Sequence, residues 1–193
     1  MSAIQTRKER ERAERHQRII DTARDLAEAQ GWEAVTVRKL ADSIEYSQPV
    51  LYSHFAGKDA IVAAVAEQGF ADMGAEFRRL RTAAPDAVAA LTAVAQGYLE
   101  FARAHPALYD AMFVMKVDLH FGPDAVETLR SAFGELVAVF APYAGASDPE
   151  AFTEVAWSAL HGLATLDRGG RLRPDFRDQR LEILVRQWTG GQS

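Results

Sequence analysis

Residues 43–60 read SIEYSQPVLYSHFAGKDA, and several hydrogen-bonding side chains lie close together in this stretch. The pattern predicts a short helix that begins after an N-cap at Ser47 and reaches about Phe55, because Pro49 is tolerated in a first helical turn. Leu51 and Phe55 are spaced to be buried on one face. The other face then carries Gln48, Tyr52, Ser53 and His54. We expect this polar face to bind a partner.

A second short helix is expected just before this segment. Thr36 is a candidate N-cap, because its hydroxyl can accept a hydrogen bond from an otherwise unpaired amide. The helix should run from Val37 to about Ile44. A longer helix over roughly residues 8–30 precedes it, and Gly31 fits the left-handed position after a helix end. Two short helices joined by a tight turn after a supporting helix are typical of a helix-turn-helix.

The second helix of such a pair is the one that enters the major groove of DNA. Gln48 can form two hydrogen bonds with an adenine edge, and Pro49 and Val50 can contact a thymine methyl group. The candidates for contacts with phosphates or bases are Tyr52, Ser53 and His54. These residue types in this order therefore favour DNA as the partner.

Further candidates lie at the ends of neighbouring helices. Lys58 begins the next helix, where free amides already favour a phosphate, and Thr36 begins the preceding one. Arg38 could reach a guanine or a phosphate from its first turn. We include the N-cap Ser47 in this DNA-binding set. The alternative is a structural helix-turn-helix that never binds DNA, in an all-α small-molecule-binding protein or enzyme, with His54 and Tyr52 serving the fold alone.

Residues 34–65, AVTVRKLADSIEYSQPVLYSHFAGKDAIVAAV, resemble the DNA-binding domain of the TetR family of transcriptional regulators. The matching positions are Thr36, Leu40, Ala41, Ser47, Leu51, Tyr52, Phe55 and Lys58. The resemblance implies a homodimer whose two helix-turn-helix domains occupy successive major grooves of a palindromic operator. It also implies base contacts by Arg38, Gln48, Pro49 and Val50, and phosphate contacts by Thr36, Tyr52, His54 and Lys58.

One position departs from the family pattern. The turn of the helix-turn-helix usually contains Ala-Gly with the glycine in a left-handed conformation, whereas this chain has Ile44-Glu45. A left-handed glutamate costs about 1 kcal/mol. We expect Glu45 to be tolerated, and the alternative is a turn of a different shape. Glu45 also adds a negative charge next to the DNA-binding helix.

The remaining sequence predicts further helices and no strands. The expected fold is all-α with about nine helices, divided into a DNA-binding domain over residues 1–60 and an effector-binding and dimerisation domain over residues 61–193. Gly122-Pro123 is expected to open a seventh helix, and Ser147 to cap an eighth. The eighth helix and a ninth over residues 176–188 should form a four-helix bundle across a two-fold axis.

The second domain is expected to bind a small, mostly apolar effector. Residues 156–166, AWSALHGLATL, and residues 105–113, HPALYDAMF, resemble the Trp-His-Gly subgroup of TetR C-terminal domains. Aromatic and thioether side chains can line an adaptable cavity, although they also build ordinary cores. The candidate ligand-binding residues are Tyr98, Phe101, Tyr109, Met112, Phe113, Phe121, Trp157 and His161.

The composition of the chain narrows the classes of protein to which it could belong. The chain has no cysteine, no apolar run that could cross a bilayer, and no catalytic motif, so we expect a cytoplasmic protein that is not an enzyme and uses no cofactor. His105, Asp118 and His120 lack a metal-binding spacing, so no metal is expected. The net charge is −5, but residues 1–24 hold seven basic and four acidic residues. That segment is either a helix laced with ion pairs or an arm that contacts phosphates.

Overall fold

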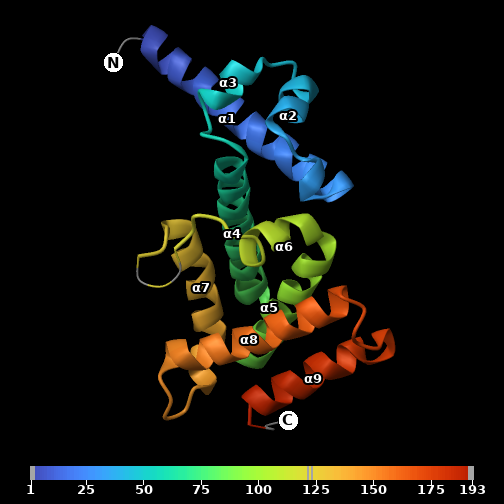
Figure 1. Cartoon of the computed structure of the whole chain (residues 1–193). Helices are drawn as coiled ribbons and strands as arrows, with labels where there is room; N and C mark the ends of the chain where they lie inside the picture. Colours follow the sequence, from blue (N-terminus) through green and yellow to red (C-terminus); the bar gives the residue numbers. More distant parts are fainter. Residues whose placement is uncertain (1–2, 121, 123, 191–193) are drawn as a thin grey trace. The chain divides into compact units, whose positions relative to one another are not determined.

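The computed structural model describes residues 3–120, 122 and 124–190, and within these residues it is entirely helical (Figure 1). The described residues contain nine α-helices and no strand, which confirms the expected fold class. The helices are α1 (Ala3–Gln30), α2 (Val37–Ser43), α3 (Gln48–Tyr52), α4 (Lys58–Ala83), α5 (Ala87–Ala104), α6 (Pro106–Phe113), α7 (Glu127–Phe140), α8 (Pro149–Arg168) and α9 (Arg177–Trp188). None of these helices is both long enough and apolar enough to cross a membrane.

The helices form two compact units. The first contains residues up to 69 together with residues 105–120, so it holds α1, α2, α3, the beginning of α4, and α6. The second contains residues 70–104 and the chain from 121 onward, with the rest of α4, α5, α7, α8 and α9. These units do not coincide with the expected division after residue 60. That division concerns function and stays a prediction.

The core of the first unit follows the apolar periodicity of its helices. Ile19 and Ala23 of α1 are fully buried, as are Leu40 of α2 and Leu51 of α3. These side chains lie at spacings that put them on one face of each helix. Helix α3 is therefore held by its apolar side, and its other side is exposed.

Helix α6 is joined to the first unit through α1 and the turn after it. Its first free amides, those of Ala107 and Leu108, donate to the Glu28 carboxylate over 3.1 and 2.9 Å. The indole N–H of Trp32 donates to the Ala107 carbonyl at 2.8 Å. A carboxylate suits this place, because the free amides and the dipole of a helix N-terminus favour negative charge.

The second unit is built around α8, which packs against α5 and α7. Tyr98 of α5, Phe140 of α7 and Leu160 of α8 are fully buried in it. Helix α9 packs against α5, and the Trp188 ring meets Phe140 edge-on with centroids 5.0 Å apart. Large apolar side chains on other sides of α8 and α9 stay exposed among the described residues, including Val155, Leu166 and Ile183.

Two expected helix starts were wrong. Helix α7 begins at Glu127 rather than at Gly122, because the Ala125 amide donates to the Gly122 carbonyl at 3.0 Å and forms a turn there. Pro123 lies outside the described residues. Helix α8 is capped by Asp148 rather than by Ser147. One Asp148 carboxylate oxygen accepts from two amides of the first turn, each at 3.0 Å.

Candidate nucleic-acid interface

The turn between α2 and α3 closes around a left-handed Glu45. Its φ is +56°, and among the described residues it is the only non-glycine residue with positive φ. The Ile44 amide donates to Leu40 at 3.1 Å, and the Tyr46 amide donates back to Ala41 at 3.0 Å. The bond from Tyr46 to Ala41 is the 6→1 bond of a Schellman motif, in which glycine usually occupies the left-handed position. The expected left-handed conformation of Glu45 is confirmed.

Caps fix the first turns of α2 and α3 differently. The Thr36 hydroxyl accepts a hydrogen bond from the Lys39 amide at 3.2 Å, so the predicted cap of α2 is present. Ser47 occupies the N-cap position of α3, but its side chain makes no capping hydrogen bond. Its backbone carbonyl accepts from the Val50 amide at 2.9 Å instead. The exposed Ser47 hydroxyl is thus not used in capping α3.

The outward face of α3 is exposed as the sequence predicts. Gln48 and Pro49 are exposed and Val50 is half-buried, while Leu51 on the opposite face is buried. Tyr52 is 56% exposed, so more than half of its surface is open to a ligand. Helix α3 ends at Tyr52 rather than near Phe55, and the Ser53 hydroxyl donates back to the Val50 carbonyl at 2.6 Å.

His54 lies in a basic environment between α3 and α1. Its Nδ1 atom is buried and has no hydrogen-bond partner among the described residues. Its ring centroid is 5.8 Å from that of His16, which stacks on Phe55 at 4.4 Å. Burial lowers the pKa of His54, and the nearby charges of Arg12, His16 and Arg15 lower it further. His54 therefore serves the packing of this unit, and its phosphate contact stays a prediction.

Two arginines of α1 contact the helix-turn-helix, and sequence reasoning missed both. The Arg12 guanidinium donates to the Ser53 carbonyl at the end of α3 over 3.0 Å. Arg18 donates to the Tyr46 hydroxyl in the turn at 3.3 Å. The partners are 41 and 28 residues apart in sequence, so no local pattern could have indicated them.

The remaining DNA-binding candidates lie at helix starts. Arg38 in the first turn of α2 has a side chain that is 82% exposed and stands 4.0 Å from Asp42. The Lys58 ammonium donates to the Trp32 carbonyl at 2.6 Å. An ammonium group has three N–H donors, so two remain for a phosphate. The structure thus presents α3 with an arginine before it and a lysine after it.

Family models cover both parts of the chain. Residues 19–65 match the model for bacterial regulatory proteins of the tetR family, and residues 91–188 match the tetracyclin repressor-like C-terminal domain. The chain belongs to the TetR family. It is therefore a TetR-family transcriptional regulator with a helix-turn-helix DNA-binding domain.

The chain is also similar to individual proteins and solved structures. An uncharacterized HTH-type transcriptional regulator of Mycobacterium tuberculosis is 28% identical over 156 residues, which are 79% of this chain and 69% of that protein. A Rhodococcus sp. RHA1 protein of unknown function has a structure with 26% identity and a TM-score of 0.78, covering 91% of this chain and 94% of that one. The regulator FadR of Bacillus subtilis, in complex with stearoyl-CoA, has 14% identity and a TM-score of 0.68, covering 88% and 97%. At that identity the likeness shows the fold alone.

The predicted effector-binding residues of this TetR chain fall into two groups. In the second unit, the Trp157 indole donates to the Tyr98 hydroxyl at 3.0 Å, and His161 Nδ1 is 3.4 Å from the same oxygen. Burial, followed by the charge of Arg168, lowers the pKa of His161. Phe101 is a half-buried residue of α5 in the same unit.

The other group lies on α6 in the first unit. Tyr109 and Met112 are buried, and the Tyr109 and Phe113 rings are 4.8 Å apart. Phe121 lies outside the described residues. The effector pocket stays a prediction. Within the described residues, no group of three or more histidine, aspartate or glutamate side chains could hold a metal ion.

A surface groove of about 790 Å³ runs between α5 and α9 in the second unit. Val88, Leu99 and Leu181 contribute apolar lining, and Glu100, Arg103 and Arg186 contribute charge. None of the predicted effector-binding residues lines it. No local sequence pattern indicates this groove, because its two walls are more than 70 residues apart in the chain.

Proposed function

We propose that this TetR-family regulator is a ligand-responsive repressor that binds a palindromic operator as a homodimer. The observation that carries the proposal is the exposed face of α3, on which Gln48 and Pro49 are open to a ligand. Arg38 and Lys58 add positive charge on either side. Such a face suits a major groove bordered by phosphates. The proposed DNA partner also implies a cytoplasmic location.

The predicted roles differ along α3. Gln48, Pro49 and Val50 would read base edges, and Arg38 would reach a guanine from α2. Tyr52 would contact a phosphate, as would Thr36 and Lys58 at the helix starts. Family membership favours this regulatory role over an enzyme with a structural helix-turn-helix, which had no catalytic motif to support it.

The proposed dimer would use the sides of α8 and α9 whose apolar side chains are exposed in the described part of the chain. Val155, Ala159, Gly162 and Leu166 recur at intervals of three and four residues and form one row along α8. Val155 is 70% exposed and Leu166 is 41% exposed. A Cβ built on Gly162 would meet no heavy atom of the described chain within 4 Å. A partner helix could therefore approach closely there and cover the apolar ends of the row.

The proposed effector would act through differential affinity for two conformations. Helix α6 carries Tyr109, Met112 and Phe113, and its first turn is fixed to α1 by Glu28 and Trp32. An effector that shifted α6 would thus act on the first helix of the DNA-binding domain. The FadR structure contains stearoyl-CoA, which supports a long apolar molecule as one effector class to test.

A gel-shift assay with the DNA that flanks the gene tests the proposal. Operator binding should weaken steeply with salt, because each phosphate contact releases counterions. Binding of the full-length protein to a discrete flanking fragment, competed poorly by unrelated DNA, supports the repressor. The absence of any salt-sensitive shift on these fragments would favour a structural helix-turn-helix.

A further inference from the structure

The apolar face of α1 continues as a row of cations toward the N-terminus. Ile19 and Ala23 are fully buried on this face. Counting back from Ile19 by four, three and four residues gives Arg15, Arg12 and Lys8. Positions at these spacings lie on the same side of an α-helix. One face of α1 therefore packs against the helix-turn-helix at Ile19 and Ala23. The same face is basic in the N-terminal part of the helix.

This basic row faces the end of α3. Arg12 donates to the Ser53 carbonyl directly after α3 at 3.0 Å. His16, next to Arg15, stacks on Phe55 at a centroid distance of 4.4 Å. Lys8 lies one turn further toward the N-terminal end of α1, which runs past α3 in Figure 1. The row thus extends from the DNA-binding helix outward along α1.

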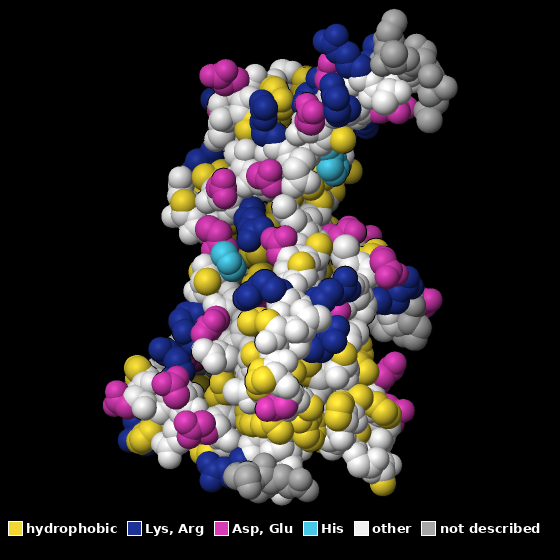
Figure 2. All heavy atoms as spheres, turned by 180° about the vertical axis from the view of Figure 1, so that it is seen from behind, with side chains coloured by type: hydrophobic (Ala, Val, Ile, Leu, Met, Phe, Trp, Pro, Cys, Tyr) yellow, Lys and Arg dark blue, Asp and Glu magenta, His cyan; other side chains and the backbone are white. Residues whose placement is uncertain are grey.

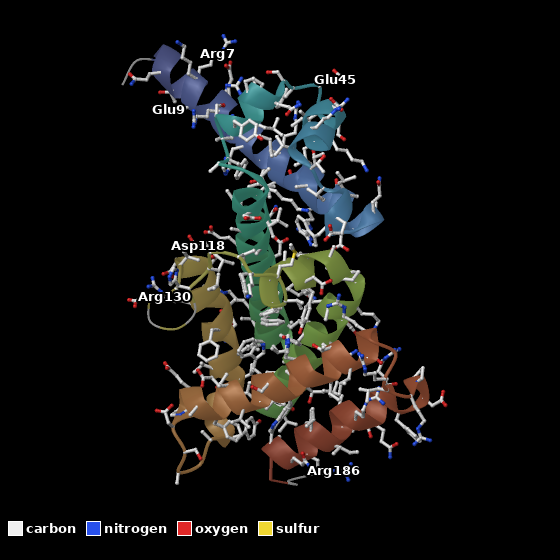
Figure 3. The ribbon with its side chains drawn as sticks, viewed as in Figure 1. Arg7, Glu9, Glu45, Asp118, Arg130 and Arg186 are labelled. Atoms are coloured by element: carbon white, nitrogen blue, oxygen red, sulfur yellow. The ribbon has the colours of Figure 1, made fainter. Side chains whose placement is uncertain are left out.

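A neighbouring side of the same segment has a different charge arrangement. Arg7 pairs with Glu11 at 2.8 Å, and Arg10 approaches Glu14 at 3.7 Å. Glu9 falls outside both rows, and Figure 3 shows it leaving α1 on a different side from Arg7. Figure 2 shows the basic and acidic side chains intermixed over this end of the unit. The carboxylates therefore neutralise the positive charges of Arg7 and Arg10 more than they neutralise those of Lys8, Arg12 and Arg15.

Within the described residues, Lys8 and Arg15 have no acidic side chain as an ion-pair partner. Lys8 is exposed and Arg15 is half-exposed, so both can reach a ligand outside the chain. Arg12 is braced against the Ser53 carbonyl, which fixes the row relative to α3. Two available cations on a helix fixed to a groove-reading helix match the phosphates that border a major groove.

We propose that the N-terminal part of α1 is a phosphate-contacting arm, in which Lys8 and Arg15 bind the DNA backbone beside the groove entered by α3. Arg12 positions the arm through Ser53. The proposal rests on the proposed operator-binding function. The charged N-terminal segment then matches both interpretations of its sequence. One side of the helix is laced with ion pairs, and another side contacts phosphates.

The test compares two double variants with equal changes in charge. Lys8→Ala with Arg15→Ala removes the proposed contacts, whereas Arg7→Ala with Arg10→Ala removes two cations from the ion-paired side. The probe is the fragment that the full-length wild-type protein selects from random DNA. Its dissociation constant is measured by fluorescence anisotropy from low to physiological salt. Circular dichroism checks that both variants retain wild-type helicity.

The salt dependence should separate the two variants. Each lost phosphate contact lowers the slope of log K against log salt by about 0.9, and a dimer carries two copies of each residue. The Lys8/Arg15 variant should therefore lose up to about 3.6 in slope while keeping the wild-type sequence preference. The Arg7/Arg10 variant should keep a slope close to that of the wild type.

Three outcomes would overturn the arm. A wild-type slope in the Lys8/Arg15 variant would show that these two residues do not contact phosphates. The proposal that α3 binds the operator would be unaffected. Equal losses in both variants would show a diffuse effect of charge rather than contacts from one side of α1. A wild-type protein without salt-sensitive binding to its selected fragment would overturn the arm and the proposed function together.

Ethylation interference with the wild-type protein gives a second measurement that does not depend on a variant. Ethylated phosphates beside each half-site should block binding, and this interference should be absent from the Lys8/Arg15 variant. Interference confined to the phosphates around the groove that α3 enters would contradict the arm.

Discussion

At the residue scale, Glu45 combines a backbone cost with an unfavourable charge. Its left-handed φ of +56° closes a Schellman turn that glycine forms without a Cβ clash. Its carboxylate projects from the turn between α2 and α3 (Figure 3). Glutamate is thus retained at a position where it opposes both folding and the approach of DNA.

Glu45→Gly should stabilise the protein by about 1 kcal/mol, because it removes the left-handed strain of a residue with a Cβ. Glu45→Gln keeps the Cβ and removes only the charge, so its unfolding free energy should stay within about 0.5 kcal/mol of the wild type. Urea denaturation measures both. Equal stabilities for the Gly and Gln variants would show that the turn carries no backbone strain.

A second prediction at this scale concerns pH and His54. Burial and the charges of Arg12, His16 and Arg15 lower the pKa of His54 in the folded state below its usual value of about 6.5. Between the lowered pKa and 6.5 the unfolded chain binds more protons than the native one, so stability must fall as the pH falls. Above about pH 6.5 this effect is absent, because the imidazole is neutral in both states.

His54→Gln should therefore flatten the dependence of stability on pH below about 6.5. The matched control is His120→Gln, which replaces an exposed histidine and leaves proton uptake at His54 intact. Urea unfolding at several pH values between 5 and 7 measures the slope. An unchanged slope in the His54 variant would exclude His54 as the source of this pH dependence.

At the element scale, Glu28 caps α6 from a helix about 80 residues earlier in the chain. The N-cap residue His105 makes no side-chain capping hydrogen bond, and Pro106 has no amide hydrogen. The Ala107 and Leu108 amides therefore depend on the Glu28 carboxylate. This cap fixes a helix with three candidate effector residues to the DNA-binding domain.

Glu28→Ala should destabilise the protein by about 2 kcal/mol, because two amides lose a charged acceptor. Glu28→Gln keeps one acceptor oxygen and should lose about 1 kcal/mol. Exposed Glu33→Ala serves as the control and should stay within about 0.5 kcal/mol of the wild type. Hydrogen exchange at the Leu108 amide should accelerate in the Glu28 variants alone. Unchanged exchange there would contradict the cap.

A structural feature can be predicted from the sequence when the residues that cause it are close together in the chain. The Thr36 cap could be predicted because it follows from a few neighbouring residues, whereas the left-handed position of Glu45 came from the resemblance to the TetR turn, where glycine is usual. The cap of α8 was assigned to Ser147 although Asp148 performs it, because both residue types favour that position. The contacts of Arg12 with Ser53 and of Glu28 with α6 join distant segments, and no periodic pattern records them.

At the scale of the whole molecule, the proposed operator binding requires two copies of the chain. A single α3 would contact one half-site, whereas two linked copies would gain affinity because the second binding event is intramolecular. The exposed apolar row on α8 is the proposed contact between the copies. Operator affinity and dimerisation should therefore be lost together.

Val155→Glu should convert the protein to a monomer, because the two-fold axis would bury a pair of like charges in an apolar contact. Operator affinity should fall on the order of 100-fold or more. Val114→Glu is the matched control, since Val114 is a 60% exposed valine of the first unit. Sedimentation and anisotropy measure the two effects. A Val155→Glu protein that sediments as a dimer would contradict the proposed interface.

The most direct test of the central claim, that α3 reads a palindromic operator, is selection of bound fragments from random DNA by full-length wild-type protein and Gln48→Ala. The wild type should enrich a palindrome whose half-sites lie about 10 base pairs apart, one helical turn. Gln48→Ala should enrich the same palindrome with relaxed preference at one position in each half-site. Enrichment of no sequence by the wild type, or an unchanged preference in Gln48→Ala, would contradict the account.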